Sequence, residues 1–113
     1  MNELAERAIA CKGWRWLPGM LALDTGLRLD EMTDDWEAEL PDLSDPSTLG
    51  CLLALVREAW EPHRGSDYIV STMHTGSGWG VGARYGSEGL ALIVLPAFDT
   101  EAEALVAALE AAP

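Results

Sequence analysis

Apolar residues recur at helical spacing in three segments of the chain, and the clearest of these lies near its middle. Asp45 is a typical N-cap residue, Pro46 stands at the first helical position, and Glu61-Pro62 marks an end. The apolar positions of this segment share one helical face: Leu49, Leu52, Leu53, Val56 and Trp60. The pattern predicts a helix that begins after Asp45 and ends at Glu61.

Both ends of the chain are also predicted to be helical. Near the C-terminus, Thr100 and Glu103 form a capping box. The apolar stripe that accompanies it consists of Ala102, Leu105, Val106 and Leu109. Near the N-terminus, Asn2 is a capping residue and Gly13 a terminating one. This short helix has one apolar face, made by Leu4, Ala8 and Cys11.

Alternating apolar positions predict a β-hairpin in the second half of the chain. The segments DYIVSTMH and WGVGARY are separated by Thr75-Gly76-Ser77-Gly78, a turn sequence. In the second segment one face carries Trp79, Val81, Ala83 and Tyr85, and the other carries Gly80, Gly82 and Arg84. We expect two half-buried strands, with Trp79 and Trp60 in the core.

Two more segments have strand character. LALIVL, from Leu90 to Leu95, is apolar on both faces, which predicts a strand in the centre of the sheet. Met20 to Leu23 and Leu27 to Leu29 flank Asp24-Thr25-Gly26, which predicts a short additional hairpin. The longest candidate loop runs from Thr33 to Ser44.

The order of elements predicts an α+β fold. Each helix has a single apolar stripe that needs a sheet or another helix to cover it. We therefore expect a sandwich-like arrangement of three helices with an antiparallel sheet of about four or five strands. The length of 113 residues predicts a single domain, residues 1–113, and 49% apolar residues are enough for a hydrophobic core.

Charge narrows the range of partners. The chain has 19 acidic residues against 7 Lys and Arg, a formal net charge of −12. Nine of the carboxylates lie between Asp24 and Asp45, where Arg28 is the one basic residue. Such a surface repels nucleic acid and anionic lipid and attracts basic proteins. We expect no direct nucleic-acid binding and no membrane association.

Localisation follows from the N-terminus and the cysteines. The sequence MNELAERAIA is charged from its third residue, unlike a signal peptide, and no segment is apolar enough for a membrane span. Cys11 and Cys51 have no CxxC spacing and are expected to be reduced, partly buried thiols, although spacing leaves a disulfide between them open. The expected location is the cytoplasm.

Catalytic motifs are weak. His63, His74 and Asp67, with Ser66 or Ser71, supply the residue types of a hydrolytic triad or a metal site, but the chain has no G-x-S-x-G elbow and no zinc-ligand spacing. A loop role for both histidines is the simpler interpretation. Cys11 or Cys51 as a nucleophile would need an electropositive pocket, and burial is the simpler interpretation.

Cofactor motifs are equally weak. Gly78, Gly80 and Ala83 fit G-x-G-x-x-A, but the segment continues as a strand, so no dinucleotide site is expected. Paired Asp34-Asp35 lacks the residue order of an EF-hand loop. We expect no cofactor and no metal.

The acidic segment is the main candidate for binding. Trp36 is surrounded by carboxylates and could anchor the segment in a basic pocket of a partner. The candidate partner-binding residues are Asp30, Glu31, Asp34, Asp35, Trp36, Glu37 and Glu39. The simpler interpretation is that the carboxylates form a solvated face and that Trp36 fixes the loop to its own core.

Three stretches carry a family resemblance. LAERAIACKGWRWLPGM, LPDLSDPSTLGCLLALVREAW and the closing EAEALVAALEAAP resemble the phage ABA-sandwich domain family, and with the Trp-bearing hairpin they cover most of the chain. The long acidic segment and LALIVL depart from that pattern. The resemblance implies a phage-derived origin in a bacterial host and no catalytic residue.

These observations favour a non-enzymatic accessory protein that binds a basic protein surface. In size and charge the chain is similar to phage-encoded inhibitors of host defence, including anti-CRISPR proteins, some of which act as DNA mimics. The alternatives are a small hydrolase or metal-dependent enzyme that uses His63, Asp67 and His74, and a virion or assembly component. A homodimer is compatible with each of these hypotheses.

Overall fold

The computed structural model describes residues 2–28, 39–61, 68–85 and 90–112. These residues form three helices and an antiparallel three-stranded sheet, which confirms the α+β class. The elements are α1 Asn2–Ile9, α2 Pro46–Trp60, β1 Tyr68–Thr75, β2 Gly78–Tyr85, β3 Leu90–Phe98 and α3 Glu101–Glu110.

Local signals explain where the two longer helices begin. The Asp45 side chain accepts the backbone N–H of Thr48, and Pro46 occupies the first turn of α2, where a missing N–H costs nothing. Thr100 caps α3 by accepting the N–H of Glu103 at 3.1 Å. Both helix starts agree with the sequence prediction.

The sheet has the order β1-β2-β3, so β2 is central. Val70 lies opposite Ala83 and Thr72 opposite Val81, as expected of a regular hairpin. The pairing of β2 with β3 is interrupted by shifts in register on both sides of Val81. At these shifts β3 comes very close to β2: a Cβ on Gly80 would lie 2.8 Å from Pro96 Cα.

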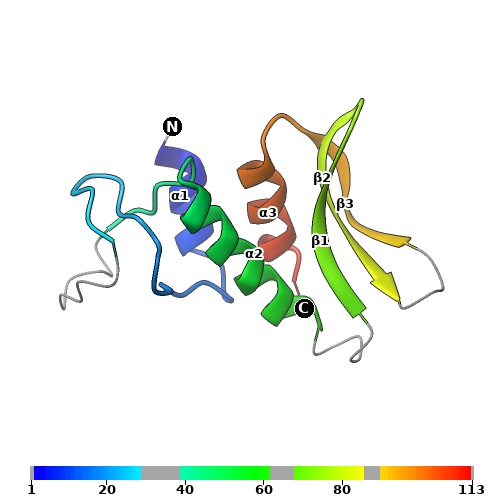
Figure 1. Ribbon diagram of the computed structural model, residues 1–113, viewed down its shortest axis with the longest axis horizontal. Helices are drawn as coiled ribbons and strands as arrows, with labels where there is room; N and C mark the ends of the chain where they lie inside the picture. Colours follow the sequence, from blue (N-terminus) through cyan, green and yellow to red (C-terminus); the bar gives the residue numbers. More distant parts are fainter. Residues whose placement is uncertain (1, 29–38, 62–67, 86–89, 113) are drawn as a thin grey trace.

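All three helices lie on one side of the sheet (Figure 1). α3 packs against all three strands, α2 packs against β1 and α3, and α1 packs against α3. The buried core joins these layers through Leu52, Leu55, Val56, Leu105, Val106, Val70, Val81 and Ala83. Trp60 and Trp79 are partly buried against this core, in agreement with the prediction.

Two predictions about the sheet were wrong. It has three strands among the described residues, not four or five. Leu90 to Leu95 belongs to β3, which is an edge strand and not a central one. Its second apolar face is solvent-exposed, because Leu92 and Leu95 are 47% and 67% exposed on the side without helices.

The additional hairpin predicted at Met20 to Leu29 is reduced to a turn. Leu21 and Arg28 form an isolated bridge, and the N–H of Ala22 donates to Leu27 O at 2.9 Å. Gly26 has a φ of 69°, a conformation that favours glycine. The segment is too short to add a strand, and it bonds instead to Pro41 and its neighbours.

At Val70, the free edge of β1 is bonded to the side chains of Arg57 on α2 and of Glu61, the C-cap residue that follows α2. Arg57 Nε donates to Val70 O at 2.7 Å, and Val70 N donates to Glu61 Oε2 at 3.2 Å. The backbone C=O and N–H of Val70 are therefore both hydrogen-bonded, to two side chains that lie one helical turn apart. This contact fixes the end of α2 against the sheet.

Candidate functional site

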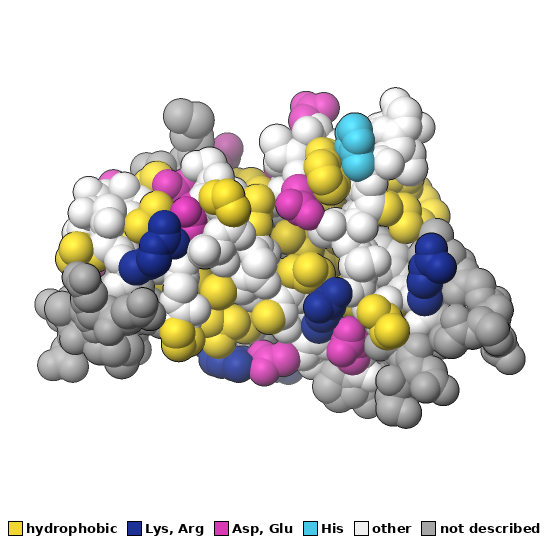
Figure 2. Space-filling view, viewed as in Figure 1, with side chains coloured by type: hydrophobic (Ala, Val, Ile, Leu, Met, Phe, Trp, Pro, Cys, Tyr) yellow, Lys and Arg dark blue, Asp and Glu magenta, His cyan; other side chains and the backbone are white. Residues whose placement is uncertain are grey.

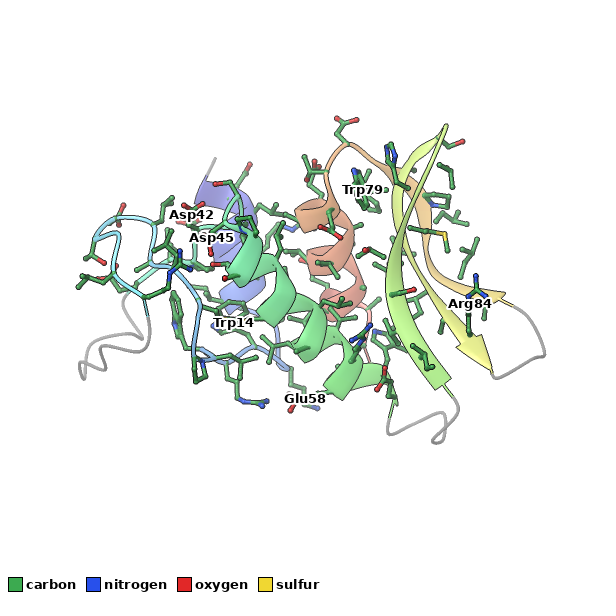
Figure 3. The ribbon with its side chains drawn as sticks, in the orientation of Figure 1. Trp14, Asp42, Asp45, Glu58, Trp79 and Arg84 are labelled. Carbon is green, nitrogen blue, oxygen red and sulfur yellow. The ribbon has the colours of Figure 1, made fainter. Side chains whose placement is uncertain are left out.

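The structure describes the two ends of the acidic segment. Six of the predicted partner-binding residues lie outside the described residues: Asp30, Glu31, Asp34, Asp35, Trp36 and Glu37. Glu39 is described and is partly buried. Asp24 is exposed, and Asp42 and Asp45 lie together at the start of α2 (Figure 3).

The two ends of the segment are paired with each other. The N–H of Leu23 donates to Leu40 O, and the N–H of Asp42 donates to Leu21 O, both at 2.8 Å. Ala22 and Pro41 form a bridge between the same stretches. The acidic segment is therefore anchored at the end of the molecule opposite the sheet (Figure 1).

Asp45 has a structural role that separates it from the other carboxylates. Its side chain accepts two hydrogen bonds from Arg28, at 2.9 and 3.1 Å, as well as those from Thr48. The bonds from Arg28, with those from Thr48, lower the pKa of Asp45 to about 2. Asp45 is thus an ionised helix cap and is not available to a partner.

A hollow lies beside this anchored end, between the first turns of α1 and α3. It encloses about 710 Å³, and its lining is apolar at Leu4, Leu43, Leu49 and Ala102 and acidic at Glu3, Glu101 and Glu103. A second hollow of about 310 Å³ adjoins it, because Leu4, Leu43 and Ser44 line both. The second also contains Leu23 and Asp42. We call the two together the leucine groove.

Three acidic side chains of the groove accept hydrogen bonds, and each accepts them through only one of its two carboxylate oxygens. Glu101 Oε2 accepts from the Thr72 hydroxyl at 2.6 Å, and Glu103 Oε1 accepts from the Thr100 hydroxyl at 3.0 Å. Asp42 Oδ1 accepts from the N–H and hydroxyl of Ser44. The opposite oxygen of each carboxylate has no hydrogen bond within the described part of the chain.

No protein-family model matches this chain, and neither a curated protein nor a solved structure does. The resemblance to the phage ABA-sandwich family therefore stays a prediction.

Most of the described arginines are neutralised by ion pairs. Arg7 makes two hydrogen bonds to Glu110, at 3.1 and 2.7 Å, and Arg15 pairs with Glu58. The arginines lower the pKa of both carboxyls. Arg7 also lines the leucine groove, but its guanidinium is bonded to Glu110 on α3.

Neither of the chemical sites weighed from the sequence is assembled by the described residues. His74 is exposed and packs on Trp79, with ring centroids 4.8 Å apart, while His63 and Asp67 lie outside the described residues. Of the two serines considered for a triad, Ser71 lies on β1 and Ser66 lies outside the described residues. No group of three or more His, Cys, Asp or Glu among the described residues could hold a metal ion. In the same part of the chain, no helix is long and apolar enough to cross a membrane.

Cys11 and Cys51 are free thiols, as expected. Cys11 donates to Arg7 O at 3.3 Å and Cys51 to Pro18 O at 3.4 Å. Burial raises the pKa of each thiol, so both are held in the protonated form that is a poor nucleophile. Cys11 also lines a hollow of about 500 Å³ with Lys12 and Glu110.

The leucine groove was not predicted from the sequence. Leu4 and Ala102 were assigned to apolar helix faces, and Glu103 to a helix cap, without any sign that they share a surface. The first turns of α1 and α3 are about as far apart in the sequence as this chain allows. The acidic first turns were visible as a local signal, because Asp and Glu favour helix N-termini.

Proposed function

We propose that this protein is a non-enzymatic binding protein whose partner presents a basic protein surface. The supporting observation is that four of the five described arginines, Arg7, Arg15, Arg28 and Arg57, are held in ion pairs within the chain, while Arg84 on β2 is exposed. Carboxylates without such pairs remain at the end that carries the acidic segment. Few described cations are therefore left to offset the formal net charge of −12, which favours a basic partner.

The arrangement of these carboxylates supports a specific partner over a merely soluble surface. In the space-filling view, acidic and apolar side chains lie next to one another over the start of α2 (Figure 2). Protein interfaces combine apolar anchors with a polar surround. Leu23 is 38% exposed in this region.

The partner proposed is a protein that handles nucleic acid. Its Lys and Arg are arranged for phosphates, and an ordered array of carboxylates competes for the same positions. Proteins that bind such a partner include phage-derived inhibitors of host defence nucleoproteins, such as anti-CRISPR proteins. The proposed location of this protein is therefore the bacterial cytoplasm, where such a target acts.

The test compares charge reversal beside Trp36 with charge reversal elsewhere. One variant carries Lys at Asp35 and Glu37, and the matched control carries Lys at Glu6 and Asp99, which are exposed and outside the groove. Proteins retained from bacterial lysate by the immobilised chain are identified, purified and titrated at 50 and 300 mM NaCl.

The proposal expects a basic partner that binds at least about tenfold more weakly to the Asp35/Glu37 variant than to the control at low salt. It also expects that the chain displaces DNA from this partner. Equal binding by both variants at both salt concentrations would contradict the proposal.

A further inference from the structure

The leucine groove combines two properties that point to one class of ligand. Three partly buried leucines, Leu4, Leu43 and Leu49, form an apolar floor in contact with the core. Four carboxylates, of Glu3, Asp42, Glu101 and Glu103, line the same groove. A ligand that fits must bring apolar side chains and positive charge on one surface.

The backbone beside the groove restricts the mode of binding. A peptide that adds to a sheet needs free N–H and C=O groups along one chain segment. At the Pro41–Ser44 wall, the N–H of Asp42 donates to Leu21 O and that of Ser44 to Asp42 Oδ1. The backbone N–H of Asp45 donates to Asp42 O. These bonds occupy backbone groups that an added strand would need, which favours recognition through side chains.

An amphipathic helix meets these conditions. Its apolar residues at positions i, i+4 and i+7 form one stripe that can enter an apolar groove, and flanking Lys or Arg can reach carboxylates on either side. The larger hollow, of about 710 Å³, is comparable with ligand clefts of about 300 to 1,000 Å³.

We propose that the leucine groove binds a basic amphipathic helix of the partner protein, with its apolar stripe on Leu4, Leu43 and Leu49 and its cations on Glu3, Asp42 and Glu103. This inference rests on the proposed function, because it assumes a basic protein partner. A second copy of this chain is disfavoured as occupant, since it would add its own net charge of −12 to an acidic groove.

The test uses two synthetic 18-residue peptides of identical Leu, Lys and Ala composition. In one, leucines follow helical spacing; in the other, they alternate with lysines at strand spacing. Both are titrated by calorimetry against the full chain at 50 and 300 mM NaCl. The groove predicts that the helical peptide binds at least about tenfold more tightly and becomes helical on binding.

Two pairs of variants localise the binding. Ser44→Trp fills the groove, because Ser44 is exposed and lines both hollows, whereas Ser77→Trp places the same side chain in the exposed β1–β2 turn. Glu3→Lys reverses a charge that lines the groove, whereas Glu6→Lys makes the same change on α1 outside it. Circular dichroism confirms that each variant is folded.

Ser44→Trp is expected to weaken the helical peptide at least about tenfold and Ser77→Trp less than about twofold. Glu3→Lys is expected to weaken it about three- to tenfold at 50 mM NaCl, and Glu6→Lys less than about twofold. Should Ser44→Trp fail to fold, the Glu3 and Glu6 pair decides the question alone.

The outcomes separate this inference from the proposed function. Equal, salt-sensitive binding of both peptides, unaffected by Ser44→Trp, would overturn the groove and leave the basic-surface proposal standing. Binding of neither peptide at 50 mM NaCl would overturn the groove, whereas the proposed function is decided by the comparison of the Asp35/Glu37 variant with its control.

Discussion

Arg28 donates two hydrogen bonds to Asp45 across the two ends of the acidic segment, at 2.9 and 3.1 Å. The same guanidinium donates to Gly19 O at 3.0 Å, and Asp45 in turn caps α2 through Thr48. Thr48 is fully buried, and its hydroxyl accepts the N–H of Leu21. One ion pair therefore fixes a helix start, a turn and the base of the acidic segment together.

Two substitutions separate the capping role of Asp45 from its charge. Asp45→Ala removes both and is expected to lower the free energy of unfolding by about 1 to 2 kcal/mol. Asp45→Asn keeps a good N-cap and should cost less. Urea denaturation at pH 7 measures both, and equal losses in the two variants would contradict the capping role.

The pH dependence of stability should also change in Asp45→Asn. The folded-state pKa of about 2 lies below the ordinary value of about 3.9, so ionised Asp45 stabilises the fold above about pH 4. This contribution is lost as the pH falls towards about 2. The stability difference between wild type and Asp45→Asn should therefore shrink over that range; a constant difference from pH 6 to pH 2 would be incompatible with a lowered pKa.

Gly80→Ala should destabilise the sheet. The added Cβ would lie 2.8 Å from Pro96 Cα, Pro96 N and Val94 O, all of them backbone atoms of β3 that cannot rotate away. We expect a loss of about 1 to 3 kcal/mol, measured by thermal unfolding. Gly76→Ala is the control, because nothing lies within 4 Å of its Cβ. Equal effects of the two would show that β3 does not approach β2 so closely.

Trp60→Phe should loosen the contact between α2 and α3. The indole Nε1 donates to Ala108 O at 2.9 Å, close to the C-terminal end of α3, where helix carbonyls lack partners. Loss of this bond is expected to cost about 1 to 3 kcal/mol in denaturant unfolding. Trp14→Phe is the comparison, since Trp14 is also partly buried against the core, and its effect should be smaller.

Cys11 and Cys51 should react slowly with thiol reagents at pH 7.4. Their pKa values are raised by burial, so the thiolate fraction is smaller than that of free cysteine. Ellman's reagent measures the rate, and urea should restore it to that of an unfolded peptide. Intact mass after alkylation in denaturant without reductant should show two adducts; an unmodified mass would reveal a disulfide instead.

Local signals in the sequence were sufficient for the helices and the hairpin. Asp45 and Pro46 specify the start of α2, and Thr100 with Glu103 specifies that of α3, because these contacts lie within one turn. The sequence of β3 was misleading, because a strand buried on both faces and a strand with one apolar face in solvent have the same pattern of apolar residues. Leu92 and Leu95 can be assigned to an open face only once the neighbouring layer is known.

The charge of the acidic segment and the capping role of Asp45 could be predicted from the sequence, and the partner-binding role of the segment stays a prediction. The pairing of Leu21 and Leu23 with Asp42 and Leu40 was not predicted, because these residues are far apart in the sequence.

The leucine groove depends on α1 packing against α3, a contact between opposite ends of the chain. No periodicity or motif encodes that contact, so Leu4 and Glu103 could be assigned to helices but not to a common surface.

The bonding of Arg57 and Glu61 to Val70 has a consequence for how these molecules behave at high concentration. An edge strand with free backbone groups is a template on which another molecule can add a strand, and such addition begins aggregation. On β1, an incoming chain would first have to displace two side-chain hydrogen bonds held by the end of α2. On β3, Pro96 has no N–H to offer. An added strand would therefore meet bonded groups at Val70 on β1 and would lack one donor at Pro96 on β3.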